Sequence, residues 1–302
     1  MNRMKRLMRT PYLPLHLMIV PGLILVLIYC YGPMIGIIIA FEKYIPVKGF
    51  FHSEWIGFEN FRYIFDLPDT VTVLKNTVYI AFLKIIAGLI TPIVFSLLLN
   101  ELRKEWFKKG IQTLIYLPHF LSWVILGGVL LDILSPSSGI VNELLVKIGI
   151  EPIFFLGSNA WFPYVLVASD VWKEFGFSTI IYLAALTSIN PTLYEAAVVD
   201  GANRWKQTLY VTIPGILPII VLMATLSLGN ILNAGFEQVF NLYSPQVFES
   251  GDIIDTFVYR IGLIDGQFGP ATAIGLFKSV VSFVFISTAY LLAYRFANYR
   301  IF

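Results

Sequence analysis

The sequence predicts an all-α integral membrane protein with six transmembrane helices and with both termini in the cytoplasm. Two observations carry this prediction: an excess of apolar residues, and basic residues that gather in alternate connections between long apolar segments. Of the 302 residues, 57% are hydrophobic and only 13% are charged, whereas about a quarter of the residues of a soluble domain are charged. A packed core of this length cannot take up so many apolar side chains, so the remainder is expected to face lipid.

The apolar segments are long enough to cross a bilayer, which takes about 20 mainly apolar residues. They lie at residues 13–41, 76–99, 112–134, 160–187, 213–234 and 270–294. Prolines inside these segments are tolerated because neighbouring helices and water-lined cavities satisfy the freed backbone groups. The basic N-terminal stretch is similar to the start of a signal sequence, but the apolar stretch after it is too long for a cleaved one. Residues 13–41 are therefore expected to remain as the first span.

The orientation follows from the lysines and arginines. Most of them lie on one side of the predicted membrane: at the N-terminus, in alternate connections, and after the sixth span. They are Arg3, Lys5, Arg6, Arg9, Arg103, Lys104, Lys108, Lys109, Arg204, Lys206, Arg295 and Arg300. Such an excess marks the cytoplasmic side. Residues 1–302 are expected to form a single transmembrane domain, with the first span and an outer connection in 1–70 and the core spans in 71–295.

Little in the sequence indicates chemistry on this chain. The one cysteine, Cys30, has no intrachain partner, and the three histidines are scattered without metal-ligand spacing. A P-loop pattern is missing, so ATP is not expected to bind by that route. We therefore expect no catalytic residue, no metal and no cofactor on the chain itself.

Residues 188–214, between the fourth and fifth spans, are predicted to form two short helices on the cytoplasmic surface. Asn190 is a good N-cap, Pro191 is a preferred first helical residue, and Gly201 stands where a left-handed residue ends a helix. A second short helix is expected at 203–210, before the fifth span opens. Local physics alone leaves two interpretations equally open, an ordinary capped amphipathic loop and a docking element for another protein.

The same segment resembles the EAA motif of the permease subunits of binding-protein-dependent ABC importers. Glu195-Ala196-Ala197, Asp200-Gly201-Ala202 and Ile213-Pro214 have the spacing of that motif, two spans before the C-terminus. In that family the segment forms coupling helices, which fit a cleft in each ATPase subunit and pass its closing motion to the membrane helices. The resemblance implies these coupling residues, the last two by position only: Glu195, Ala196, Ala197, Asp200, Gly201, Ala202, Arg204 and Trp205.

The resemblance covers nearly the whole chain, and residues 233–243 and 267–279 are similar to the branch that transports oligosaccharides and polysaccharides. It implies the type I importer permease fold in a bacterial cytoplasmic (inner) membrane, with an oligosaccharide as substrate; a fragment of an acidic or complex polysaccharide is among the candidates. It also implies several partners. These are a second homologous permease, two ATPase subunits that bind ATP and Mg, and an extracytoplasmic solute-binding protein.

Polar side chains inside membrane spans are costly and indicate a functional cavity by default. Three explanations remain open for them here: they line the translocation path, pair between helices, or contact the partner permease. Local pairing of Asp170 with Lys173 is favoured, whereas Lys84 and Lys278 have no partner within their own helices. These two lysines either meet acidic groups elsewhere or favour an anionic sugar such as a uronate. The candidates for the path are Lys84, Trp172, Lys173, Glu174, Phe177, Asn230, Asn233, Glu237, Gln238 and Lys278.

The aromatic candidates allow stacking on a sugar, although packing is the commoner role of aromatic residues in membrane helices. Replacement of Lys173 or Glu174 is expected to lower uptake and to leave coupled ATP hydrolysis intact.

Three rival functions have distinguishable signatures. A permease of the same family for a polyamine or an inorganic ion would share the coupling loop but not segments 233–243 and 267–279. A polytopic membrane enzyme would need His, Asp or Cys residues clustered at one membrane depth, which the sequence does not show. A secondary transporter would carry an inverted repeat between its halves, and none is visible.

Overall fold

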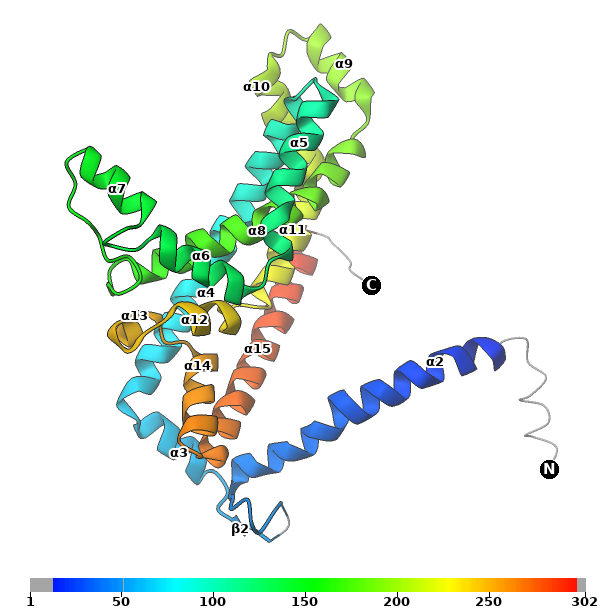
Figure 1. The fold of residues 1–302 in the computed structure, drawn as a ribbon. Helices are drawn as coiled ribbons and strands as arrows, with labels where there is room; N and C mark the ends of the chain where they lie inside the picture. Colours follow the sequence, from blue (N-terminus) through cyan, green and yellow to red (C-terminus); the bar gives the residue numbers. More distant parts are fainter. Residues whose placement is uncertain (1–12, 51, 298–302) are drawn as a thin grey trace, which may run out of the picture. The chain divides into compact units, whose positions relative to one another are not determined.

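The described chain is almost entirely helical, which confirms the all-α prediction. A computed structural model describes residues 13–50 and 52–297, and its regular structure is helical apart from one antiparallel pair of short strands, β1 (Glu42–Lys43) and β2 (Glu54–Trp55) (Figure 1). The basic residues Arg3, Lys5, Arg6, Arg9 and Arg300 lie outside the described residues. The chain divides into two compact units, Met1–Asp66 with Arg260–Leu276, and Leu67–Tyr259 with Phe277–Phe302.

The first unit is built around the apolar segment Leu15–Phe41, which is long enough to cross a membrane and is almost unburied within the chain. Its helical elements are α2 (Leu13–Val26), η1 (Leu27–Tyr31), η2 (Gly32–Phe41), α3 (Glu59–Asp66), η6 (Arg260–Ile264) and the start of α15 (Phe268–Ala297). Phe41, the last residue of the segment, stacks on Trp55 at a centroid distance of 5.6 Å. The buried amide of Asn60 donates to the carbonyls of Ala40 and Glu42 at 3.0 and 3.1 Å. These contacts fix the outer connection to the end of the apolar segment.

The second unit holds the remaining helices, together with the later part of α15. In chain order they are α4 (Pro68–Glu101), α5 (Glu105–Tyr116), η3 (Leu117–Phe120), α6 (Trp123–Ile133), α7 (Ile140–Lys147), α8 (Phe162–Thr187), α9 (Pro191–Val199), α10 (Arg204–Gln207), η4 (Thr208–Thr212), α11 (Ile213–Leu228), α12 (Phe236–Leu242), η5 (Pro245–Val247), α13 (Phe248–Gly251) and α14 (Ile254–Tyr259). The long helices α4 and α8 pack along one another. The prediction of a single domain is not tested by this division and stays a prediction.

Four helical segments are long and apolar enough to cross a membrane, within the described residues: Leu15–Phe41, Pro68–Glu101, Arg204–Leu228 and Phe268–Leu291. The bent pair Glu105–Phe120 and Trp123–Ile133 raises the number to five. The remaining predicted span corresponds to α8, which is 26 residues long and carries Asp170, Lys173 and Glu174. These helices are compatible with six spans, and the count of six and the side of the termini stay predictions.

The predicted span at 112–134 is bent. The chain bends by 106° between Phe120 and Trp123. Pro118 has no amide hydrogen to continue the helix, and the hydroxyl of Ser122 accepts a hydrogen bond from the backbone of Ile125 at 3.4 Å, which starts α6 as a new helix. The segment therefore consists of two half-helices with a break between them.

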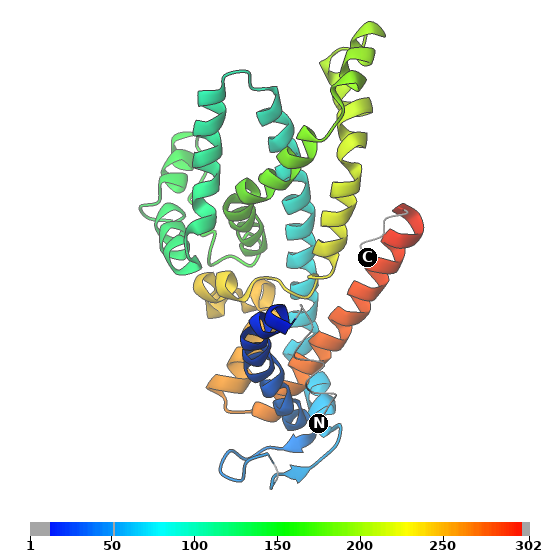
Figure 2. The same cartoon turned by 90° about the vertical axis from the view of Figure 1, so that its right-hand side faces the viewer.

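The core of the second unit lies between α4, α8 and the segment that runs from Ala234 to Ile253. Its buried residues are Ile80, Ala81, Leu156, Phe162, Val165, Leu166, Ala234, Val239, Leu242, Val247 and Ile253. A smaller core joins Tyr182 and Leu186 of α8 to Ile216 of α11. Figure 2 shows the chain leaving α11 and turning across α4 toward α12. This crossing places polar residues from three separate parts of the sequence close together.

The outer connection at 135–158 is ordered by one asparagine. Asn142 is buried, and its amide donates to the carbonyls of Leu134, Ser135 and Ile153 at 3.2, 3.0 and 3.1 Å. Its oxygen accepts from the backbone of Ile153 at 2.7 Å. One side chain thus satisfies four backbone groups, which fixes α7 against both ends of the connection.

Candidate functional site

A cavity of about 320 Å³ lies among α4, α8, α11 and the chain that follows α11. This volume is at the lower end of the range of small-molecule pockets. The predicted fifth span, 213–234, is wrong at its end, because α11 ends at Leu228 and the chain then turns. The residues that line the cavity are Ala81, Lys84, Ile85, Gly88, Leu89, Asp170, Ser178, Tyr182, Met223, Ser227, Asn230, Asn233, Ala234 and Gly235. The turn brings the predicted path residues Asn230 and Asn233 to the cavity.

Tyr182 lies in the wall of the cavity, and its hydroxyl is unpaired. The residue is only 1% exposed, and its hydroxyl has no hydrogen-bond partner among the described residues. A buried hydroxyl left without a partner costs free energy, but this oxygen lies in the core that joins α8 to α11 and is not exposed to a ligand in the cavity. Sequence reasoning missed Tyr182 as a site residue, because a tyrosine in an apolar stretch gives no local sign of what its hydroxyl faces.

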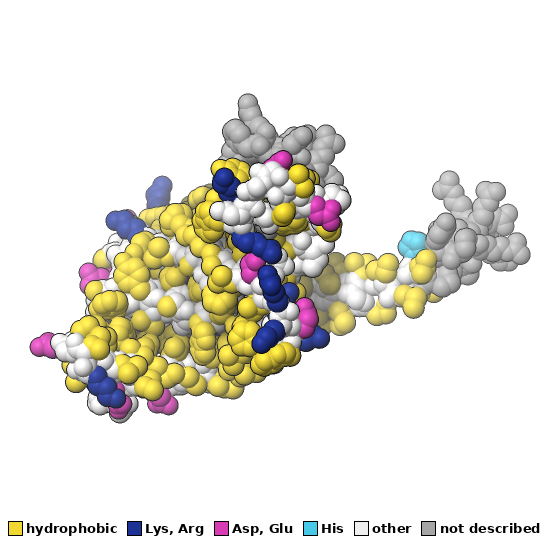
Figure 3. All heavy atoms as spheres, turned by 90° about the horizontal axis from the view of Figure 1, so that it is seen from above, with side chains coloured by type: hydrophobic (Ala, Val, Ile, Leu, Met, Phe, Trp, Pro, Cys, Tyr) yellow, Lys and Arg dark blue, Asp and Glu magenta, His cyan; other side chains and the backbone are white. Residues whose placement is uncertain are grey.

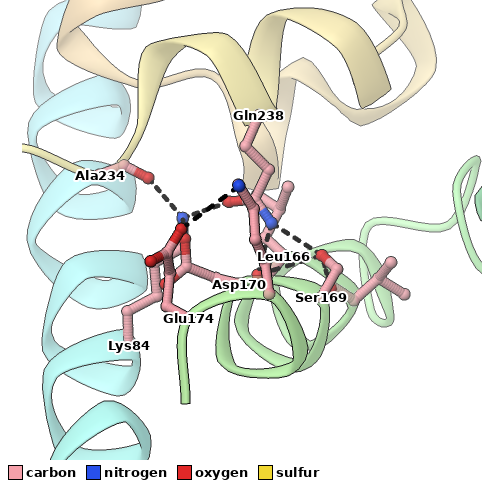
Figure 4. Close-up of polar contacts among 9 residues, drawn as sticks. Lys84, Leu166, Ser169, Asp170, Glu174, Ala234 and Gln238 are labelled. Carbon is pink, nitrogen blue, oxygen red and sulfur yellow. Dashed lines mark hydrogen bonds and ion pairs between the residues drawn. The ribbon is translucent and has the colours of Figure 1, made fainter. Parts of the chain in front are cut away.

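Lys84 of α4 is the centre of a polar network beside the cavity (Figure 4). Its ammonium group contacts Asp170 Oδ1 at 3.2 Å and the carbonyl of Ala234 at 2.7 Å, and it also donates to Gln238 Oε1. Of the two alternatives for Lys84, the structure shows an acidic partner on another helix, Asp170 of α8. The network joins α4, α8 and α12, together with Ala234 just before α12.

The segment between α8 and α11 has the caps that the sequence predicts. Asn190 Oδ1 accepts from the backbone of Thr192 at 3.1 Å at the start of α9, and Gly201 has φ +75° just after its end. Asn203 Oδ1 accepts from the backbone of Lys206 at 2.9 Å at the start of α10. The second helix expected at 203–210 begins where predicted, but it does not end before the fifth span, because α10, η4 and α11 continue without a break over Arg204–Leu228.

The surface of this segment exposes large apolar side chains. Val199 is 87% exposed, Trp205 is 70% exposed, and Val198 and Leu193 are more than half exposed. A neighbouring polar cavity of about 530 Å³ is lined by Glu101 and Arg103 of one connection and by Arg204 of the other. Figure 3 views this end of the second unit, where lysine and arginine side chains gather. Two connections that the sequence places on the same side of the membrane thus meet at one end of the unit.

The comparisons with known proteins identify the family. Residues 85–298 match the model described as "Binding-protein-dependent transport system inner membrane component". The chain belongs to this family. The protein is therefore a transport permease of the bacterial inner membrane, a multi-pass component of an importer that works with a binding protein.

Relatives of this permease cover nearly all of its length. It is 44% identical over 94% of its chain to the polygalacturonan/rhamnogalacturonan transport system permease protein YteP of Bacillus subtilis strain 168, and covers 88% of that protein. It is 40% identical to protein LplB of the same organism over 93% of its chain and 89% of LplB. A solved structure of a bacterial ABC transporter for the import of the acidic polysaccharide alginate matches with a TM-score of 0.89 and 39% identity. The match covers 98% of the permease and 99% of that chain.

In this permease, the polar residues of α8 divide into two groups. Asp170 faces the cavity, whereas Lys173 and Glu174 reach the break between η3 and α6. The ammonium of Lys173 donates to the carbonyls of His119 and Leu121 at 2.6 and 2.9 Å and lies 3.5 Å from Glu174. The expected pairing of Asp170 with Lys173 is wrong, because Lys84 takes Asp170 and the free carbonyls at the break take Lys173.

The other predicted path residues of the permease lie away from the cavity. Phe177 stacks on the ring of His119 at 4.2 Å, and Trp172 lines an apolar pocket with Trp161 and Tyr164. Lys278 pairs with Asp255 of α14 at 2.5 Å, so its partner is an acidic group on another helix. Glu237 lies in the first turn of α12. Of the predicted residues, the cavity brings together Lys84, Asn230 and Asn233, with Gln238 behind Lys84.

Proposed function

We propose that this permease carries a uronic-acid-containing oligosaccharide across the membrane, driven by ATP hydrolysis in two partner ATPase subunits. One observation carries the proposal: the walls of the polar cavity are continuous with the segment at 188–214. Helix α8 contributes Asp170, Ser178 and Tyr182 to the cavity and leads directly into α9. Helix α11 contributes Met223 and Ser227 and continues from α10. A movement of α9 and α10 is therefore passed along the chain, through α8 and α11, to the walls of the cavity.

The substrate class rests on the polar groups of the cavity and on the relatives. Amides and hydroxyls such as those of Asn230, Asn233 and Ser178 are suited to the hydroxyl groups of a sugar. Two similar proteins are named for polygalacturonan/rhamnogalacturonan and for alginate. Polygalacturonan, like alginate, is a polymer of sugar acids. These relatives favour an acidic oligosaccharide over a polyamine or an inorganic ion.

The partners follow from the exposed surface of α9 and α10. Val198, Val199 and Trp205 are apolar, exposed and at the end of the unit where basic side chains gather. This surface is suited to an ATPase subunit, which would bind the ATP and Mg that this chain is not expected to hold. Glu195, Ala196, Ala197, Asp200, Gly201, Ala202, Arg204 and Trp205 are the residues that we propose to couple the two subunits. A second permease would complete the path, and an extracytoplasmic binding protein would deliver the sugar; a related alginate importer is known in complex with its periplasmic protein.

The substrate proposal is tested by uptake into proteoliposomes that contain both permeases, the ATPase subunits and the binding protein. Wild-type protein is expected to take up labelled acidic oligosaccharides only when ATP is present. Ser178→Ala and Asn233→Ala each remove a polar group from the cavity, so KM is expected to rise about two- to tenfold, as for the loss of one neutral hydrogen bond. Tyr79→Phe is the matched control, because the Tyr79 hydroxyl pairs with Tyr164 outside the cavity lining. An unchanged KM in both cavity variants would contradict this assignment of the path.

The coupling proposal is tested at Gly201. Its φ of +75° is strained for a residue with a Cβ, so Gly201→Ala is expected to cost about 1 kcal/mol locally and to distort the turn between α9 and α10. Both sugar-stimulated ATP hydrolysis and uptake should fall, and less ATPase subunit should co-purify with the permease. Gly149→Ala is the control, because Gly149 has φ +85° in the outer connection and equally open surroundings. Equal losses in the two variants would show a general folding defect and no coupling role.

A further inference from the structure

The ammonium group of Lys84 is fully used inside the protein. Lys84 is 9% exposed, and an ammonium has three hydrogens to donate. Three acceptors surround it: Asp170 Oδ1 at 3.2 Å, the Ala234 carbonyl at 2.7 Å, and Gln238 Oε1. A ligand in the cavity therefore finds no spare hydrogen on this group.

The acceptors around Lys84 are themselves fixed. Gln238 is fully buried, and its Nε2 donates to the Leu166 carbonyl and to Ser169 Oγ, both at 2.7 Å. This leaves its oxygen for Lys84 and sets the orientation of the amide. Lys84 thus joins α4 to α12 and to the chain just before it, and Gln238 of α12 joins this helix to α8.

Gly235 makes room for the ammonium. A Cβ at Gly235 would lie 3.1 Å from Lys84 Nζ, and the residue has φ +93°. Both the space and the backbone conformation therefore favour glycine at this position. The ammonium lies against the backbone of residues 234–235, directly beside Asn233 in the cavity wall.

The charge of Lys84 is balanced within the chain. A buried ammonium is costly unless an opposite charge lies close to it, and Asp170 supplies that charge. Among the cavity-lining residues that the structure describes, the ionised side chains are these two. A carboxylate entering the cavity would have to displace Asp170 from Lys84 or approach Asp170 as a like charge.

We infer that Lys84 is a positioning residue and does not bind the carboxylate of the substrate. The Lys84–Asp170 pair holds the wall at residues 233–235 in place, and this wall recognises the neutral hydroxyl face of the sugar. The carboxylate of an acidic oligosaccharide is then recognised outside this cavity. The inference rests on the proposed function for its substrate, but the ion pair can be measured without any sugar.

The first arm of the test uses the purified transporter complex. Thermal unfolding is measured for the wild type, Lys84→Gln, Asp170→Asn and the double variant. Each single variant is expected to melt at a lower temperature, because each leaves one partner of a buried pair uncompensated. The double variant should lose less than the sum of the two single losses. Additive losses would overturn the ion pair as a positioning element.

The second arm compares two substrates in reconstituted transporters, a tri-galacturonide and the same trisaccharide with its carboxyl groups reduced to alcohols. Lys84→Gln is expected to reduce uptake of both sugars by the same factor, about tenfold for a lost charged hydrogen bond. A loss confined to the acidic sugar would overturn the inference, because it would make Lys84 the counter-ion of the carboxylate. If the wild type takes up neither sugar, the proposed substrate is wrong, and the unfolding measurements still decide whether the pair positions the wall.

Discussion

Replacement of Gly176 by leucine is expected to prevent the permease from folding, and replacement by alanine to lower its thermal stability. A Cβ at Gly176 of α8 would lie 2.0 Å from the carbonyl oxygen of Ile115 and 2.5 Å from its carbonyl carbon in α5. These are backbone atoms, so no side-chain rotation relieves the clash, and α5 and α8 must separate. Small residues allow this kind of close helix approach in membranes, and overpacking costs about 1–3 kcal/mol or more. The measurement is the unfolding temperature of the purified transporter complex, with the yield of folded protein for the leucine variant.

Gly128→Ala is the matched control for this prediction. Gly128 also lies inside a helix, α6, but a Cβ there would have no neighbour within 4 Å. Alanine has a better helix propensity than glycine by about 1 kcal/mol, so the control is expected to be as stable as the wild type or more stable. Equal stability of the alanine variants at positions 176 and 128 would contradict a tight contact between α5 and α8.

Local rules predicted the local features of this permease well. Hydropathy located the long apolar helices, and cap chemistry located the ends of α9 at Asn190 and Gly201. These features depend on a few consecutive residues, so the sequence contains all the information that they need. The break at Pro118 was missed because the same sequence pattern is compatible with a kinked continuous span.

Contacts between distant residues were harder to predict. Residues 84, 170 and 238 are far apart in the sequence, and their contacts depend on how α4, α8 and α12 pack. The sequence favours a pair between the near neighbours Asp170 and Lys173. In the structure each binds a partner on another element instead: Asp170 binds Lys84, and Lys173 binds the carbonyls at the break. The unpaired hydroxyl of Tyr182 had no local sign, because its burial and its missing partner are both properties of the packed structure.

Lys173→Met is expected to destabilise the permease by about 2–4 kcal/mol, because it leaves the carbonyls of His119 and Leu121 without their donor. Lys173 is 7% exposed, so water does not easily replace the lost hydrogen bonds. The break between η3 and α6 should then loosen, which lowers the unfolding temperature and the maximal rate of uptake. KM is expected to stay unchanged, because Lys173 does not line the cavity. Unfolding temperatures and the concentration dependence of uptake provide the two measurements.

The sequence alone predicted a different outcome at Lys173, with uptake reduced and coupled ATP hydrolysis intact. In the structure Lys173 stabilises the break between η3 and α6, which packs on α8, and α8 leads into α9. Loss of Lys173 is therefore expected to reduce both uptake and coupled ATP hydrolysis. Lys147→Met, on the exposed α7, is the control for loss of a lysine charge. Glu174→Gln should have a weaker effect than Lys173→Met, because the Glu174 side chain is 42% exposed. A raised KM with normal stability in Lys173→Met would return this residue to the translocation path and contradict its role at the break.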